Sequence, residues 1–396
     1  MATRDAVNTI RGYFYQFDYS IIQVLSLSND DETICVEGIE DVDINKGDSV
    51  ELHQCKCYEG TEYNHSVIAS AVRWMLMHFS ENKDSGYNYY IYGDFKSGQQ
   101  KLASVTLEFV KRNFFTYTKN KQKHVIHSEL GLSDEDLLKF LQQLKININA
   151  ESYNDQVDRV KDVICSVLGC KKQNVEPYYC NALSIIKALS TSKDVANRTI
   201  SKKEFVRKLK EVDDHYEMWQ LHKNGVTKFA KAVKKKYFDN GMNISPYNRF
   251  FLIECRDNIS ITELKTVVLE ISKKYSKLRK RDNPKFCPYF YFYGLSDEQL
   301  VELKRRLSRD NVVFVDGYDY KGADFNARSI TKEPDTGRLV SVKIIDDIDM
   351  LDSVYGYVNS TIEIYQFFCD MVYYENMDFK HVKIPFENIS DISEMI

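Results

Sequence analysis

The residues best suited to chemistry lie between positions 37 and 56, where carboxylates precede a Gln-x-Lys pair. Residues two apart on a strand share a face. In the run ICVEGIEDVDI we therefore expect Glu37, Asp41 and Asp43 to project to the same side, provided that no bulge intervenes. This places three carboxylates along one edge of the predicted sheet.

The Gln-x-Lys pair lies on the next predicted strand, VELHQCKCY. Gln54 and Lys56 share one face of it, whereas His53, Cys55 and Cys57 point the other way. A carboxylate followed after a short gap by Q-x-K is the pattern of metal-dependent nucleases.

These residue types fit Mg²⁺ chemistry. Mg²⁺ prefers hard oxygen ligands, which Asp41 and the side-chain carbonyl of Gln54 supply together with waters and a phosphate oxygen. The ion activates a water, and Lys56 orients that water or stabilises the charge on the scissile phosphate. Because Gln54 is neutral, we expect Glu37 or Asp43 to contribute to metal binding directly or through water.

A plainer interpretation stays open at this point. Asp41 and Asp43 precede a turn containing Gly47, so both could be ordinary turn carboxylates. Lys56 could be a charge that protects an edge strand from aggregation.

The surrounding periodicity predicts the elements that position these residues. A first helix carries apolar residues at helical spacing from Tyr13 to Leu25. With this helix included, the expected order of elements is α-β-β-β-α-β-α, which describes a mixed α/β core. After the first helix come strands 33–36, 42–44 and 49–58, helix 65–81, strand 88–95 and a helix from about 103 to 115.

Three motifs in this order carry a resemblance: GYFYQ at 12–16, EGIEDV at 37–42 and QCK at 54–56. Together they resemble the nuclease domain of anti-phage CBASS and Lamassu effectors, most closely the Lamassu nuclease subunit, over about residues 4–215. The resemblance implies a restriction-endonuclease-like (PD-(D/E)xK) fold. It also implies that Gln16, Asp41, Gln54 and Lys56 line the active site. Family members often carry Asp-Asp at the Glu40-Asp41 step, which makes Asp41 rather than Asp43 the main metal ligand.

The resemblance further implies an activity and its partners. These are Mg²⁺-dependent cleavage of double-stranded DNA, with Mn²⁺ able to substitute, in an effector that is silent until infection. The resemblance implies that the nuclease activity is controlled by subunits of an SMC-like ATPase complex and by homo-oligomerisation on activation.

The rest of the chain is expected to form a helical lobe and a second domain. We place the nuclease domain at 1–215, with a core at 1–125 and a strand-free helical lobe at 126–215. A basic helix and linker follow at 216–245, and an α/β domain at 246–396. In that domain we expect strands 249–254, 286–293, 311–316 and 340–345, helices 261–280 and 297–308, and a closing helical stretch near 351–371.

The second domain contains no nucleotide-binding glycine motif and no cluster of catalytic spacing. Docking onto partner subunits is the preferred role, and binding of a cyclic oligonucleotide is the alternative. A non-catalytic DNA-binding scaffold is a further alternative for the whole chain.

A basic and aromatic stretch follows the second core helix. Its side chains are suited to holding a phosphate backbone, although a solvated face beside core aromatics explains them equally well. The basic residues are Lys111, Arg112, Lys119, Lys121 and Lys123.

The composition limits the possible partners and the cellular compartment of the protein. The net charge of -4 means that DNA contact requires local basic patches. Nine cysteines, an odd number without a CxxC pair, favour a reducing cytoplasm, and Cys55 and Cys57 lack the histidine spacing of a zinc site. No signal peptide or apolar run long enough for a membrane span is evident, so no membrane partner is expected.

Overall fold

The computed structural model describes residues 6–29, 32–102, 104–239, 248–256, 259–333, 340–376 and 378–396. The chain divides into two compact units, Met1–Val212 and Asp213–Ile396. Both are α/β structures, as the sequence predicts, and each has its own sheet and hydrophobic cores. None of the helices within the described residues has the length and apolar character needed to cross a membrane.

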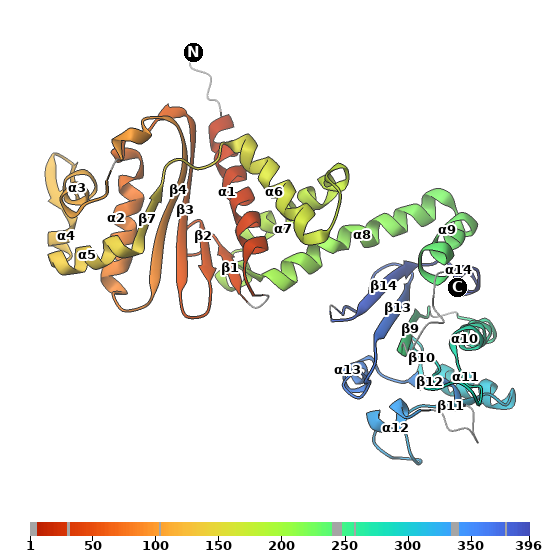
Figure 1. The fold of residues 1–396 in the computed structure, drawn as a ribbon. Coiled ribbons are helices and arrows are strands. Elements are labelled where there is room, and N and C mark those ends of the chain that lie inside the picture. The colour runs from red at the N-terminus through yellow and green to blue at the C-terminus, as the bar shows by residue number, and fades with distance from the viewer. Residues whose placement is uncertain are drawn as a thin grey trace. The chain divides into compact units, whose positions relative to one another are not determined.

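The first unit is built on a mixed sheet of six strands (Figure 1). Three central strands, β1 (Thr33–Val36), β2 (Val42–Asn45) and β3 (Val50–Glu62), follow one another in antiparallel pairing. β4 (Tyr87–Ser97) then lies parallel to β3. The order across the sheet is β7-β4-β3-β2-β1-β8.

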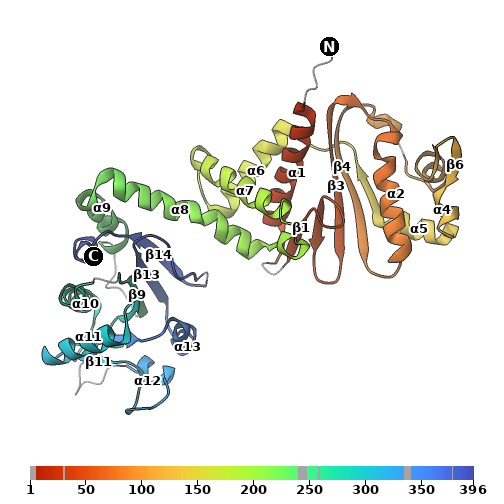
Figure 2. The same cartoon turned by 180° about the vertical axis from the view of Figure 1, so that it is seen from behind.

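Helices cover both faces of this sheet, as Figures 1 and 2 show from opposite sides. On one face α1 (Val7–Ser26), α6 (Tyr153–Leu168) and α7 (Glu176–Ser190) pack on β1 and β2. On the other, α2 (His65–Glu81) and α5 (Asp134–Gln143) pack on β3 and β4. The predicted order α-β-β-β-α-β is therefore confirmed, and helix 65–81 has the predicted bounds.

Shorter elements complete this unit. The helix predicted from about 103 is observed as α3 (Leu107–Val110) continued by a π-helical turn (Lys111–Phe115), and residue 103 lies outside the described residues. The others are η1 (Gln99–Lys101), the hairpin β5 (Thr116–Lys119) and β6 (Gln122–Val125), α4 (Ile126–Glu129), η3 (Lys172–Asn174) and η4 (Val195–Arg198). α8 (Lys202–Asn224) runs across the boundary between the units.

The expectation of a strand-free lobe at 126–215 is wrong. β7 (Leu144–Asn147) pairs with β4, and β8 (Thr199–Ser201) pairs with β1, so this segment supplies both edges of the sheet. Strands of three or four residues are too short to show an alternating pattern, because their pairing partner and not their own sequence decides their conformation.

The second unit contains a parallel six-stranded sheet in the order β11-β12-β10-β9-β13-β14. Four of the strands lie close to their predicted positions: β9 (Asn248–Glu254), β10 (Tyr289–Tyr293), β11 (Val313–Val315) and β12 (Val340–Ile345). Helices α10 (Ile261–Tyr275) and α11 (Asp297–Arg309) also match, with α10 ending before the predicted residue 280.

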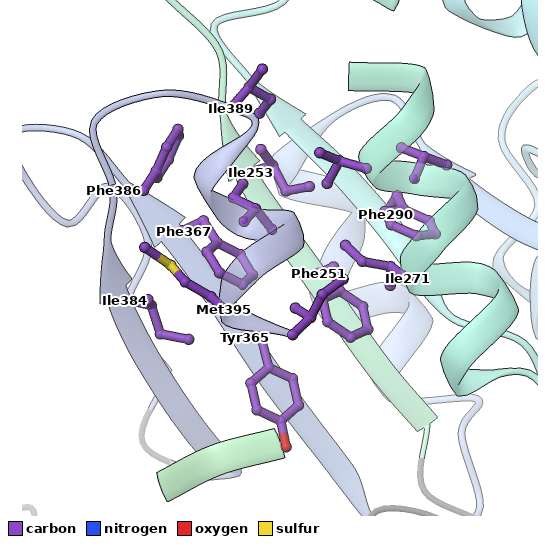
Figure 3. Packing of buried hydrophobic residues seen from close by; sticks show 14 of the residues in the cluster. Phe251, Ile253, Ile271, Phe290, Tyr365, Phe367, Ile384, Phe386, Ile389 and Met395 are labelled. Carbon is purple, nitrogen blue, oxygen red and sulfur yellow. The ribbon is translucent and has the colours of Figure 1, made fainter. Parts of the chain in front are cut away.

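The larger core of this unit lies between the sheet and the helices α10, α11 and α14 (Asp391–Met395), together with α9 (Val226–Val233). Figure 3 shows Phe251, Phe367 and Met395 meeting in this core. The apolar side of the predicted basic helix is thus packed in the core of the second unit, through Phe229 and Val233. A π-helical turn (Lys234–Phe238) follows it, and residues 240–245 of the predicted linker lie outside the described residues.

The other face carries α12 (Ala327–Thr331), η6 (Ile348–Met350) and α13 (Leu351–Tyr355). The closing helix expected near 351–371 is wrong beyond residue 355. β13 (Ile362–Phe368) occupies that segment, and β14 (Lys380–Pro385) follows it. Every residue of β13 is buried because both faces of the sheet are covered, so the run lacks the alternation that identifies a strand.

Candidate functional site

The turn between β1 and β2 determines where the candidate carboxylates lie. Val36 pairs with Val42, and the amide of Glu37 donates to the carbonyl of Asp41 at 3.0 Å. Residues 37–41 form the end of the hairpin that joins the predicted strands 33–36 and 42–44, so the expectation that Glu37 shares a strand face with Asp41 and Asp43 is wrong. Glu37 has a φ of 55°, a left-handed conformation that is incompatible with a continuing strand.

Asp41 lies at the end of this turn, beside β3. Its Oδ2 accepts a hydrogen bond from the Gln54 amide nitrogen and another, of 2.7 Å, from the backbone amide of Cys55. Burial raises the pKa of Asp41, whereas the Cys55 amide and the charge of Lys56 lower it. The predicted juxtaposition of Asp41, Gln54 and Lys56 is thus present in the structure.

The two faces of β3 separate as the alternation predicts. His53 accepts or donates a 2.8 Å hydrogen bond with Tyr19 of α1, and Cys55 belongs to the core on that side. Half-buried Lys56 lies on the opposite face, next to Gly93 of β4. A Cβ atom on Gly93 would lie 3.4 Å from the Cβ atom of Lys56 and 2.8 Å from the ring of Phe95. The glycine therefore leaves space beside the lysine.

Gln16 is buried on α1, with 6% of its surface exposed. Its amide nitrogen donates to Glu37 Oε1 at 2.7 Å and to the carbonyl of Asp41 at 3.4 Å. Arg198 donates to the carbonyl of Glu37 at 2.6 Å. Gln16 and Glu37, both predicted as catalytic residues, are thus joined to each other and to the turn, where they hold Asp41 in position.

Asp43 holds the turn together. Its two carboxylate oxygens accept hydrogen bonds from the backbone amides of Ile39, at 2.6 Å, and Glu40, at 3.0 Å. Burial raises the pKa of Asp43 to about 6, and these two amides lower it. Both carboxylate oxygens thus close the turn, and the predicted part of Asp43 in metal binding stays a prediction.

Glu40 was not selected from the sequence as a site residue, yet it is buried, with 8% of its surface exposed. Its Oε1 accepts no hydrogen bond from the described residues. Burial, followed by the charges of Asp41 and Asp43, raises the pKa of Glu40 to about 8, whereas Lys56 lowers it. The acidic pair Glu40-Asp41 is visible in the sequence, but the burial of Glu40 depends on the turn.

These donors fit a magnesium ion. Mg²⁺ is commonly held by one or two carboxylates together with waters and substrate phosphate, and Asp41 and Glu40, whose Oε1 has no partner among the described residues, supply two hard carboxylate ligands. Among the described residues no three His, Cys, Asp or Glu side chains group closely enough to hold a metal by themselves. The Gln54 carbonyl would therefore be needed, and its amide, which now points its nitrogen at Asp41, would have to flip.

The five basic residues predicted to contact DNA lie away from this turn in the sequence. They differ in whether their charge is already paired within the protein. Lys111 forms an ion pair of 2.7 Å with Asp134. Lys119, Lys121 and Lys123 lie exposed on the β5–β6 hairpin, and Arg112 is exposed on the π-helical turn. The hairpin lysines thus form a basic tip that can contact phosphates.

Comparison with known proteins gave no family. No protein-family model matches the chain, and no curated protein matches it.

Proposed function

We propose that the first unit is a Mg²⁺-dependent endonuclease with a restriction-endonuclease-like fold that cuts double-stranded DNA. The observation that carries the proposal is the convergence of Asp41, at the end of the β1–β2 turn, with Gln54 and Lys56 of β3. Asp41 accepts hydrogen bonds from the Gln54 side chain and from the Cys55 amide. Lys56 lies two residues after Gln54 on the same face of β3. The α-β-β-β-α-β order supports the proposed fold.

Each residue has a defined part in the proposed reaction. Asp41 and the Gln54 carbonyl would hold the cation, which when bound supplies Lewis-acid activation of water and offsets phosphate charge. Lys56 would orient the attacking water or donate to the phosphate as negative charge builds on it. Gln16 keeps Asp41 in place through the turn.

The biological setting is proposed on the motif resemblance alone. GYFYQ, EGIEDV and QCK resemble the effectors of anti-phage CBASS and Lamassu systems. We therefore propose an effector of a cytoplasmic defence complex, gated by SMC-like ATPase partner subunits and by oligomerisation of the nuclease. Assembly would bring two nuclease units together, as cutting both strands requires.

The proposal is tested with the full chain and its Lys56→Ala variant on supercoiled plasmid, with Mg²⁺, Mn²⁺ or EDTA and over a range of protein concentrations. We expect cleavage by the wild type with either ion and a loss on the order of 100-fold or more in the variant. A steep dependence on protein concentration would indicate assembly. Equal cleavage by both proteins would remove Lys56 from the mechanism and contradict the proposed site.

A second candidate function concerns the second unit. Its chain proceeds from β9 to β10 on one side and returns to β13 on the other, so the strand order reverses beside β9. Parallel α/β sheets bind small ligands at the carboxyl ends of strands at such a reversal. There Glu254 accepts the Cys369 amide at 2.6 Å, and Tyr293 stacks on Tyr373 with ring centroids 4.2 Å apart. The carboxyl edge beside β9 is therefore a candidate site for the alternative role of this unit, binding of a cyclic oligonucleotide.

The sensor candidate is tested by titrating the full chain with cyclic dinucleotides and trinucleotides in a calorimeter. Binding that is lost in Tyr293→Ala, but not in Tyr357→Ala, an exposed tyrosine that precedes β13 at the amino edge of the sheet, would support it. The absence of binding to all of these cyclic oligonucleotides would leave docking onto partner subunits as the proposed role of this unit.

A further inference from the structure

The turn at residues 37–41 brings together two carboxylates that a strand would separate. Neighbouring residues on a strand point to opposite faces. Glu40 and Asp41 are neighbours, but they lie in the turn that closes the β1–β2 hairpin and not within a strand. Because they lie in a turn, their side chains can approach the same point.

The turn is held by contacts from three directions. Asp43 accepts the amides of Ile39 and Glu40, Gln16 donates to Glu37 and to the Asp41 carbonyl, and Arg198 donates to the Glu37 carbonyl. A group held by several hydrogen bonds from separate elements is positioned before any ligand arrives. The fold therefore maintains the approach of Glu40 to Asp41 in the absence of a bound cation.

Glu40 is the member of this cluster whose environment is incomplete. More than nine-tenths of its surface is buried, and its Oε1 accepts no hydrogen bond among the described residues. A buried polar atom without a partner costs free energy, and a bound ion is one of the partners that removes this cost. A divalent cation is the partner that suits a buried carboxylate beside a second carboxylate.

From this geometry we infer that Glu40 is a direct ligand, together with Asp41, of the divalent cation used by the proposed nuclease. The inference rests on the proposed function and replaces Glu37 and Asp43 in the metal site. Glu37 binds Gln16, and Asp43 binds the turn amides. Both of those carboxylates support the turn. Glu40 and Asp41 provide the two negative charges that balance the divalent cation.

The test measures binding of Mn²⁺ to the full chain, from the electron paramagnetic resonance signal of free Mn²⁺, with and without a phosphorothioate DNA duplex that resists cleavage. Glu40→Gln is compared with Asp41→Asn and with Glu62→Gln, which makes the same change at an exposed position of β3. We expect the first two variants to weaken Mn²⁺ binding by roughly tenfold or more and Glu62→Gln to leave it unchanged.

Two further measurements separate a ligand from a structural residue. Circular dichroism and thermal unfolding verify that Glu40→Gln is folded, and Glu40→Asp, which keeps the charge on a shorter side chain, should retain part of the affinity. Plasmid cleavage by Glu40→Gln should recover as the Mg²⁺ concentration is raised.

The outcomes distinguish this inference from the proposed function. If Glu40→Gln binds Mn²⁺ as wild type does while Asp41→Asn does not, Glu40 is not a ligand and the nuclease proposal stands. If the wild type binds no Mn²⁺ in either condition, the metal site and the proposed nuclease both fail.

Discussion

Among single residues, the local hydrogen bonds decide which carboxylates are available for chemistry. Asp41 is partly buried and Asp43 is buried two positions later, yet their hydrogen-bond partners differ. Asp41 faces Gln54 and Cys55 on β3, whereas Asp43 closes its own turn. A shared face on a strand is thus insufficient evidence for a shared function.

This difference predicts opposite effects for two matched substitutions. Asp41→Asn should abolish DNA cleavage with little loss of stability, because the Asn side-chain carbonyl can accept the same hydrogen bonds from Gln54 and Cys55. Asp43→Ala should lower the free energy of unfolding by about 1–3 kcal/mol, since it leaves the Ile39 and Glu40 amides without acceptors. Urea unfolding and plasmid cleavage of both variants measure this. A loss of activity in Asp43→Ala without a loss of stability would restore Asp43 as a metal ligand.

At the scale of elements, α1 links the helical face of the first unit to the site. It carries Gln16 toward the turn and, two residues later, the fully buried Asp18 toward α7. Tyr179 of α7 donates to Asp18 at 2.9 Å. Burial raises the pKa of Asp18 to about 7, although Tyr179 and Lys161 lower it.

The raised pKa of Asp18 predicts a pH-dependent stability. The folded state holds the proton more tightly than the unfolded state, where the pKa is 3.8. The contribution of this group to stability is therefore greatest below pH 3.8 and falls as the pH rises towards 7. Asp18→Asn should remove on the order of 1–3 kcal/mol of the stability difference between pH 5 and pH 8 in urea unfolding. The exposed Asp158→Asn serves as the control, and an unaltered pH dependence in Asp18→Asn would contradict the raised pKa.

A second prediction at this scale concerns the pairing of β3 with β4. Gly93→Ala should destabilise the first unit by roughly 1–3 kcal/mol, because its Cβ atom would lie 2.8 Å from the buried ring of Phe95. The added group also approaches Lys56, so cleavage should fall as well. Gly60, beside which a Cβ atom meets no atom within 4 Å, provides the control substitution Gly60→Ala. If Gly93→Ala keeps the thermal stability of the wild type, the Phe95 ring moves aside at little cost and the prediction is wrong.

For the molecule as a whole, the division into two units with separate cores has a thermodynamic consequence. Phe251 is fully buried in the larger core of the second unit, and the candidate nuclease residues all belong to the first. Phe251→Ala should cost about 3–5 kcal/mol in the second unit. Scanning calorimetry should then show two transitions, of which one moves to lower temperature. Metal-dependent cleavage by the first unit should persist below that transition, and a single transition that shifts as a whole would show that the units unfold together.

The sequence by itself determined the elements with strong periodicity and the side chains that share a strand face. Helix 65–81, the order α-β-β-β-α-β and the separation of His53 from Gln54 and Lys56 all follow from local patterns, because repeats of 3.6 and 2 residues reflect burial directly. The approach of Asp41 to Gln54 follows from the same patterns, since their strands are joined by a short turn.

Only the tertiary structure decided what depends on contacts between distant segments. The hairpin end at 37–41 is held by Gln16 and Arg198, and it buries Glu40 while occupying Asp43. The edge strands β7 and β8 and the buried strand β13 also depend on their neighbours. In each case the conformation is selected by a partner far away in the chain, whose position no local pattern encodes.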